Sequence, residues 1–141
     1  MSPDAVIGQY YEFYNDRRFR ESAELFTKDA VIEHAPFGRV SPSGGQGYIE
    51  SAERSLVAFP DAHLEVLAVQ AHGDTIFEIE LVATGTHRGV LDLGTYGQFE
   101  PTGVYVRVRH REVLEIRGGL ITYASVTLDV NDLVVQLTPR P

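Results

Sequence analysis

The chain has 141 residues, twenty acidic against twelve basic side chains for a net charge of −8, and no cysteine. This length fits one domain spanning residues 1–141, and the missing thiols exclude disulfides and cysteine-based metal sites or nucleophiles. Because the net charge repels phosphate backbones and anionic lipids, we expect neither nucleic acid nor a membrane as a partner. The first residues lack the basic and apolar regions of a secretory signal, which favours a cytoplasmic location.

A helix is predicted over residues 3–17. Ser2 is a favourable N-cap, Pro3 suits the first helical position, and apolar side chains then recur at helical spacing. Two of them, Tyr10 and Tyr14, combine a large apolar ring with a hydroxyl group. Core packing explains most tyrosines of this kind, but both are also candidates for contacting a bound substrate.

Two further helices are predicted over residues 19–26 and 46–58, with a short strand over residues 30–34 between them. Phe59 follows the last of these helices and is a candidate inward-facing contact for a substrate. The intervening residues 39–47, RVSPSGGQG, are typical of a loop. They lack the lysine and the spacing of a phosphate-binding loop, so we expect no nucleotide site there.

From residue 64 onward the apolar period changes from helical to two. Strands are predicted over residues 64–71 and 75–87, joined by a hairpin turn at residues 72–74. Alternation along the second strand brings His87 to its buried face, either as a satisfied strand-end histidine or as a residue that lines a pocket. The glycine-rich residues 88–103 follow, and their apolar side chains, including Phe99, are typical of a lid.

The next strand pattern covers residues 104–113, VYVRVRHREV. Its arginines share one face and must reach water, so the valine face is predicted to be the inner one. This alternation brings His110 and Glu112 to the inner face. Each has a structural alternative, because His110 has charged neighbours typical of a surface and Glu112 can pair with an arginine of a neighbouring strand.

A final strand is predicted over residues 120–129 after the Gly118-Gly119 turn. Its apolar residues alternate with polar ones, and the apolar face is the expected core face. That assignment places Ser125 and Asp129 on the outer face. The apolar tail at residues 133–137 is suited to capping the open end of the sheet or to an oligomer interface.

Helices followed by mostly antiparallel strands predict an α+β fold whose bent sheet is covered by helices and encloses an apolar pocket. The order of elements and the strings LFTKDAVIEHAPFG, FPDAHLEV, ATGTHRG, EPTGV, GGLITYASVTLD and VVQL resemble the SnoaL-like polyketide cyclases of the nuclear-transport-factor-two-like superfold. The resemblance covers nearly the whole chain. It implies a cone-shaped α+β barrel, with about three N-terminal helices packed on a curved, mostly antiparallel sheet.

The resemblance also implies site residues. Asp129 matches the aspartate that serves as general acid and base in such cyclases, which conflicts with its outward place in the alternation. His110 is the nearest match to the assisting histidine of the preceding strand. Ser125 stands where family members usually carry an aromatic residue, a departure that bears on the substrate. The string AVIEHAPFG resembles the segment that holds the catalytic carboxylate of ketosteroid isomerases, with His34 in its place.

These residues imply a cofactor-free enzyme that closes a ring by aldol addition on a hydrophobic, polyketide- or steroid-like substrate. One buried carboxylate can remove a proton flanked by carbonyls and return it to the new alkoxide, with a histidine assisting. Isomerisation or hydration in the same pocket, and a non-catalytic ligand-binding module, remain alternatives. A metal site formed by His34, His87, His110 and Asp129 is disfavoured because these residues lack ligand spacing.

We also expect a homodimer or a higher homo-oligomer. A single curved sheet exposes its convex face, which here would carry Tyr105, Arg107, Arg109 and Val113.

Overall fold

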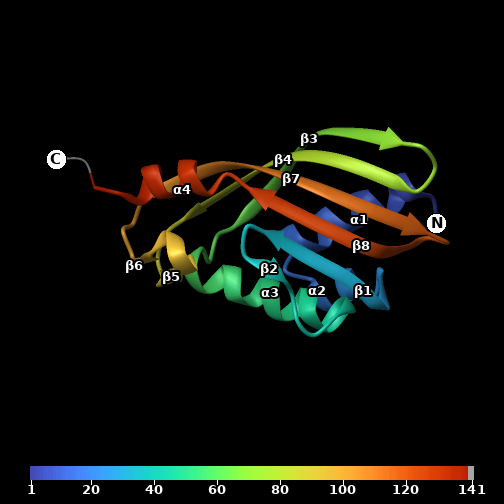
Figure 1. Cartoon of the computed structure of the whole chain (residues 1–141), viewed down its shortest axis with the longest axis horizontal. Helices are drawn as coiled ribbons and strands as arrows, with labels where there is room; N and C mark the ends of the chain where they lie inside the picture. Colours follow the sequence, from blue (N-terminus) through green and yellow to red (C-terminus); the bar gives the residue numbers. More distant parts are fainter. Residues whose placement is uncertain (140–141) are drawn as a thin grey trace.

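The computed structural model describes residues 1–139 and has a six-stranded sheet in the order β2-β1-β8-β7-β4-β3, with helices against it (Figure 1). The helices are α1 (Pro3–Asn15), α2 (Phe19–Ala23), α3 (Gly44–Ala58) and α4 (Val130–Leu137), with a 3₁₀ turn at Gly94–Tyr96. The strands of the sheet are β1 (Phe26–Ala35), β2 (Gly38–Arg39), β3 (His63–His72), β4 (Ile76–Thr86), β7 (Tyr105–Arg117) and β8 (Leu120–Leu128). A separate pair is formed by β5 (Leu91–Asp92) and β6 (Gln98–Phe99).

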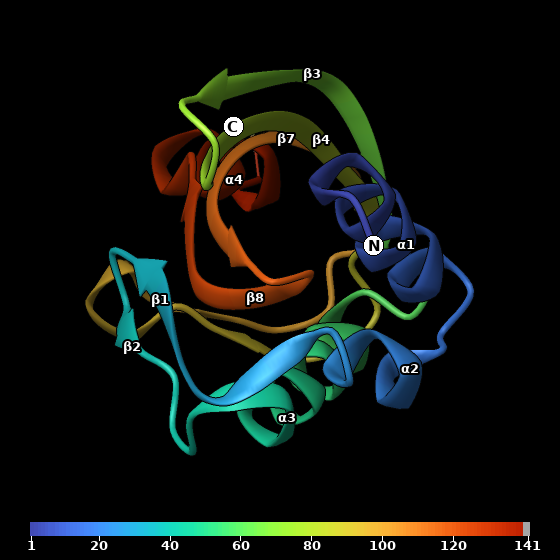
Figure 2. The same ribbon diagram turned by 90° about the vertical axis from the view of Figure 1, so that its right-hand side faces the viewer.

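The sheet bends into an arc. Figure 2 shows β3, β4, β7, β8 and β1 following one another around the molecule, while α1, α2 and α3 close the open side. All strand pairs of the sheet are antiparallel except β1 with β8. This is the expected cone-shaped α+β architecture, and in the described residues none of the helices is long and apolar enough to cross a membrane.

Strand β7 lies at the centre of the sheet and follows the predicted alternation. It pairs with β4 on one side and with β8 on the other. The inner face carries the buried side chains of Val106, Val108, Glu112, Leu114 and Ile116, and the arginines of the strand are exposed on the outer face. Because the arginines keep to water, one face of the longest strand is fixed toward the interior.

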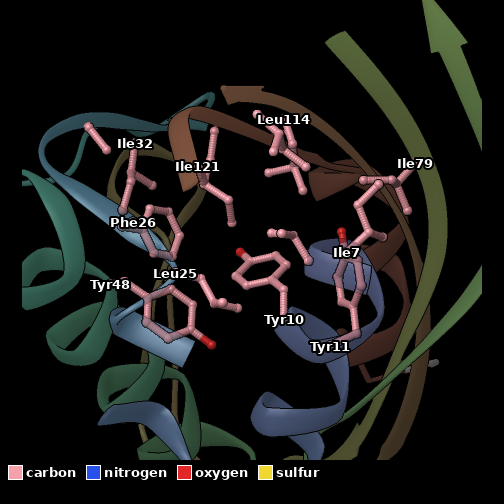
Figure 3. Close-up of a cluster of buried hydrophobic side chains, with 14 of the residues drawn as sticks. Ile7, Tyr10, Tyr11, Leu25, Phe26, Ile32, Tyr48, Ile79, Leu114 and Ile121 are labelled. Carbon is pink, nitrogen blue, oxygen red and sulfur yellow. The ribbon is translucent and has the colours of Figure 1, made fainter. Parts of the chain in front are cut away.

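The interior contains two hydrophobic clusters. The larger one joins α1, α2 and α3 to the sheet and is rich in aromatic rings (Figure 3). Tyr10, Phe26 and Tyr48 pack with ring centroids 5.3–5.8 Å apart, within the range of favourable aromatic pairs. The second cluster lies where α4 and the β5–β6 segment meet β7, and it consists of Leu93, Val106, Val108, Leu133 and Leu137.

Several elements differ from their predicted bounds. Helix α1 ends at Asn15, α2 is limited to residues 19–23, and β1 begins at Phe26 instead of residue 30. The polar residues after Phe26 are typical of a connection between two elements. In the structure they belong to an irregular part of β1, where the register of β1 against β8 shifts between Phe26 and Val31. A β-bulge lets polar residues reach solvent without ending the strand.

The apolar tail forms a helix, α4. Asp129 is its N-cap, and its side chain accepts a hydrogen bond from the Asp132 amide at 3.0 Å. Farther along α4, the Gln136 side chain accepts from the Arg107 amide at 3.0 Å and donates to the Arg107 carbonyl at 2.9 Å. Since β8 pairs with β7 only from His110 onward, Gln136 satisfies backbone groups of β7 beyond the end of β8.

Glycines allow α3 to approach its neighbours closely. A Cβ atom on Gly47 would collide with the Pro42 carbonyl oxygen, whereas a Cβ atom on Gly8, on α1, would meet nothing within 4 Å. The glycines of the predicted loop therefore serve the packing of a helix start.

Replacing Gly47 by Ala is expected to lower the free energy of unfolding by about 1–3 kcal/mol, the usual cost of overpacking. Gly8→Ala is the matched control, and it should raise stability by about 0.5–1 kcal/mol because alanine is the better helix former. Urea unfolding of both variants measures the difference. Equal effects of the two substitutions would contradict the close approach at Gly47.

Candidate functional site

A cavity of about 690 Å³ lies between the two hydrophobic clusters. Its walls come from β1, α3, β4, the β5 segment, β7, β8 and α4, and most of the lining surface is apolar. Val106, Val108, Val126, Leu128 and Leu133 line one side of it. The volume is in the usual range for small-molecule sites, so a ligand of several rings can be enclosed.

Two predicted catalytic residues, His34 and His110, both line this cavity. His34 is on β1 and His110 on β7, and β8 lies between them, with Val126 beside His34 and Leu128 beside His110. The fold thus brings together two histidines that are 76 positions apart in the sequence. Because Val126 and Leu128 share the inner face of β8, both imidazoles face the same space.

Both histidines have lowered pKa values. Burial is the main cause in each case, and it brings the pKa of His110 from its ordinary 6.5 to about 4, with a smaller contribution from His34. The nearby Arg54 adds to the effect of burial in lowering the pKa of His34. Both rings are therefore neutral near pH 7, and a neutral imidazole has one nitrogen that donates and one that accepts.

Helices α1 and α3 contribute hydroxyl groups and a cation. The Tyr14 and Ser55 hydroxyls are 3.1 Å apart, and Ser55 donates to the Ala52 carbonyl at 2.7 Å, which leaves Tyr14 as the donor to Ser55. Ser51 and Arg54 also line the cavity from α3. These three α3 residues are not among the predicted site residues, although positions 51, 54, 55 and 58 have the spacing of one helical face.

Asp129 does not line the cavity. It is exposed at the start of α4, where it caps the helix. Ser125 pairs with Val113 and Glu33 in the row of side chains on the outer face, and it does not line the cavity either. The structure therefore places Ser125 and Asp129 outside the cavity, as the alternation along β8 predicts, and does not bring Asp129 together with His34 and His110.

Glu112 lies outside the cavity lining, next to Tyr10 and Tyr11 of the larger cluster, and is only 3% exposed. Burial raises the pKa of its carboxyl from 4.5 to about 7, and the nearby hydroxyls of Tyr10 and Tyr11 offset part of this rise. The rings of both tyrosines extend from α1 toward the sheet (Figure 3). Among the described residues no arginine or lysine forms an ion pair with Glu112, so the expected pairing with a neighbouring arginine is absent there.

The remaining predicted contacts divide between the cavity and the core. Phe59 and Tyr14 line the cavity, whereas Tyr10 belongs to the larger cluster and Phe99 packs against the second one. His87 is completely buried, with its Nδ1 atom 2.9 Å from the Thr102 hydroxyl and its ring against Phe59 at 5.5 Å. Its Nδ1 atom is satisfied, as the structural alternative predicts, whereas its Nε2 atom is buried and has no hydrogen-bond partner among the described residues.

The segment after β4 forms one rim of the cavity, through Val90, Leu91, Asp92 and Leu93. Its position over one end of the cavity fits the predicted covering segment. Within residues 1–139, no group of three or more His, Asp or Glu side chains is arranged to hold a metal ion.

The fold and the cavity are those of the cone-shaped α+β proteins of the nuclear-transport-factor-two-like superfold. The sequence model of the SnoaL-like polyketide cyclases then matches residues 4–137. The chain therefore belongs to the SnoaL-like polyketide cyclase family. Among curated proteins, none matches the chain significantly.

Solved structures support the fold. AclR of Streptomyces galilaeus, provisionally assigned as a hydroxylase, is 24% identical with a TM-score of 0.78, over 98% of this chain and 96% of that one. IdmH of Streptomyces antibioticus, provisionally assigned as a polyketide cyclase, is 24% identical with a TM-score of 0.79. The match covers 97% of this chain and 99% of IdmH. A SnoaL-like protein of Jannaschia sp. CCS1 with the same provisional assignment is 16% identical with a TM-score of 0.83. The match covers 100% of this chain and 98% of that protein. At these identities the likeness shows the fold alone.

The buried carboxyl of Glu112 predicts a pH-dependent stability. Because its pKa is about 7 in the folded protein against 4.5 ordinarily, the folded state keeps a proton that the unfolded state has released. The stabilisation of the folded state by this retained proton is complete below about pH 4.5, and it is lost as the pH rises through about 7. At 1.36 kcal/mol per pKa unit the full loss is about 3 kcal/mol.

Glu112→Gln removes this titration with little change in shape, so the difference in unfolding free energy between wild type and variant should change with pH in that window. Urea unfolding at a series of pH values measures it. Glu24→Gln, at an exposed position after α2, is the control and should follow the wild type. A pH-independent difference for Glu112→Gln would contradict the raised pKa.

Proposed function

We propose that the protein is a cofactor-independent acid/base enzyme that closes a ring by intramolecular aldol addition on a hydrophobic, polyketide-like substrate. The observation that carries the proposal is the pair of neutral imidazoles, His34 and His110, facing one largely apolar cavity. Membership of the SnoaL-like polyketide cyclase family supports the class of reaction.

His34 is the proposed base. A general base works best when its pKa lies near the working pH, and a histidine with a pKa of about 4, such as His110, holds a proton too weakly for that role. His34 is less deeply buried than His110, and burial is the main cause that lowers the pKa of both rings. Its free nitrogen can remove a proton from a carbon flanked by two carbonyl groups, which is acidic enough for an imidazole to deprotonate.

His110 is the proposed hydrogen-bond donor. Because its ring stays neutral at pH 7, its N–H group can donate to the carbonyl oxygen next to the reacting carbon and stabilise the negative charge of the enolate. Its place deep in an apolar wall strengthens this interaction, since little water competes with it.

The steps balance without any added reactant. His34 takes the proton as the C–H bond breaks, and the electron pair forms the enolate. The enolate carbon attacks a second carbonyl carbon of the same substrate to form the new C–C bond. The resulting alkoxide takes the proton back from His34, so the substrate and product are isomers and the enzyme is restored.

A second candidate function is binding without turnover. Of the described residues that line the cavity, the only carboxylate is Asp92, on the exposed rim, so the cavity lacks the carboxylate base that the family resemblance implied. Isomerisation or hydration through the same two histidines uses the same proton transfers. Substrate analogues that bind but do not react would support the binding function.

Replacing His34 by Gln is expected to lower kcat for ring closure of a synthetic linear triketone, in which a methylene between two ketones can attack the third, about 10²- to 10⁴-fold, the usual contribution of a general base. Absorbance and mass spectrometry follow the cyclic product. His63→Gln, at an exposed position, should keep wild-type activity. Asp129→Asn should keep most of it, and loss of activity in Asp129→Asn but not in His34→Gln would return the role of base to Asp129.

We further propose that the protein forms a homodimer or a higher homo-oligomer through the convex face of the sheet. On this face, arginines of β7 lie beside glutamates of β4, with Arg111 and Glu78 3.3 Å apart and Arg109 and Glu80 3.8 Å apart. Neighbouring rows of opposite charge can match the same rows of a second copy after a two-fold rotation. The exposed ring of Tyr105 adds apolar area.

Light scattering at micromolar concentration is expected to give at least twice the monomer mass of 15.7 kDa. Reversal of charge by Arg109→Glu should shift the protein toward the monomer, because like charges would then face each other. Arg20→Glu, on α2, is the control for net charge. A monomer in the wild type would refute the assembly.

A further inference from the structure

Arg54 differs from the other charged residues at the cavity. It lies on α3, lines the cavity, and in the described part of the chain it has no carboxylate within 4 Å. The second lining arginine, Arg39, is 3.6 Å from Glu33. Among the described residues that line the cavity, Arg54 is therefore the cation whose charge can pair with a ligand.

The rest of the lining does not compensate this charge. His34 and His110 are neutral near pH 7, and Asp92 lies on β5, where its carboxylate accepts a hydrogen bond from the Gly94 amide at 2.9 Å. Burial, and next to it the charge of Arg54, lower the pKa of His34, so the cation acts on the space around the proposed base. A protein with a net charge of −8 thus has a local positive site at its cavity.

We infer that Arg54 binds a carboxylate carried by the substrate, so that the substrate is an apolar polyketide-type acid and not its neutral ester. This inference rests on the proposed function. The carboxylate would lie against α3, with Arg54 as a two-pronged donor and the Ser51 hydroxyl one turn earlier on the same face. The apolar body then extends into the cavity toward His34 and His110.

A carboxylate fits this site better than a phosphate. A single guanidinium balances one negative charge, whereas a phosphate dianion usually requires several donors or cations. The exposed position of Arg54 at the mouth also suits a group that stays partly in water, while the reacting carbon is held deeper. Because exposed ion pairs are weakened by solvent, the preference for acid over ester should be about tenfold, near the lower end for hydrogen bonds to charged groups.

Calorimetry with two probes tests the inference, anthraquinone-2-carboxylate and its methyl ester. The wild type should bind the acid about tenfold more tightly, and this advantage should shrink as salt is raised to about 0.5 M. Arg54→Gln should bind both probes with the affinity that the wild type has for the ester. Arg20→Gln makes the same change in net charge on exposed α2 and should keep the preference.

The inference is overturned if the wild type binds acid and ester equally, if it binds neither, or if Arg54→Gln weakens both probes alike. An equal loss of preference in Arg20→Gln would also overturn it, because net charge alone would then be the cause. These measurements need no turnover. A variant His34→Gln that keeps full ring-closing activity, in a protein that prefers the acid through Arg54, would refute the catalytic proposal and leave the carboxylate site intact.

Discussion

The alternation of side chains along β7 is the constraint on which the rest of the structure depends. Leu114 and Ile116 join the cluster under the N-terminal helices, and Val106 and Val108 join the cluster under α4. His110 lies between these pairs and faces the cavity between the two clusters. A shift of this strand by one residue would turn its arginines inward and its valines to water, so the site exists only in the observed register.

Much of this arrangement could be predicted from the sequence, because the signal is strong along long strands. Arginines at every second position of β7 leave one choice of inner face, and the same periodicity in β4 places Ile79 and Leu81 in the core. The inward place of His110 follows from its neighbours. Its meeting with His34 does not, because that depends on the pairing of β1 with β8, which joins segments distant in the sequence.

The differences between the sequence-based expectations and the structure have local physical causes. Asp129 matches a catalytic position by analogy, but the chain turns there into α4, and a carboxylate at a helix start is held by backbone amides. The helix itself was difficult to predict because it has only eight residues and follows a strand directly. Arg54 was missed for another reason, since an arginine on a helix face is usually solvated, and only the cavity beside α3 gives it a role.

The two hydrophobic clusters and the cavity between them affect which substitutions the protein can accept during evolution. The aromatic cluster under α1, α2 and α3 supplies packing at one end, while the mouth of the cavity is formed by α4, the β5 segment and the exposed edge of α3. Substitutions at the mouth leave the aromatic cluster intact. Within such a framework, ligand choice can diverge among descendants of one gene while folding is conserved, because the two properties depend on largely separate sets of side chains.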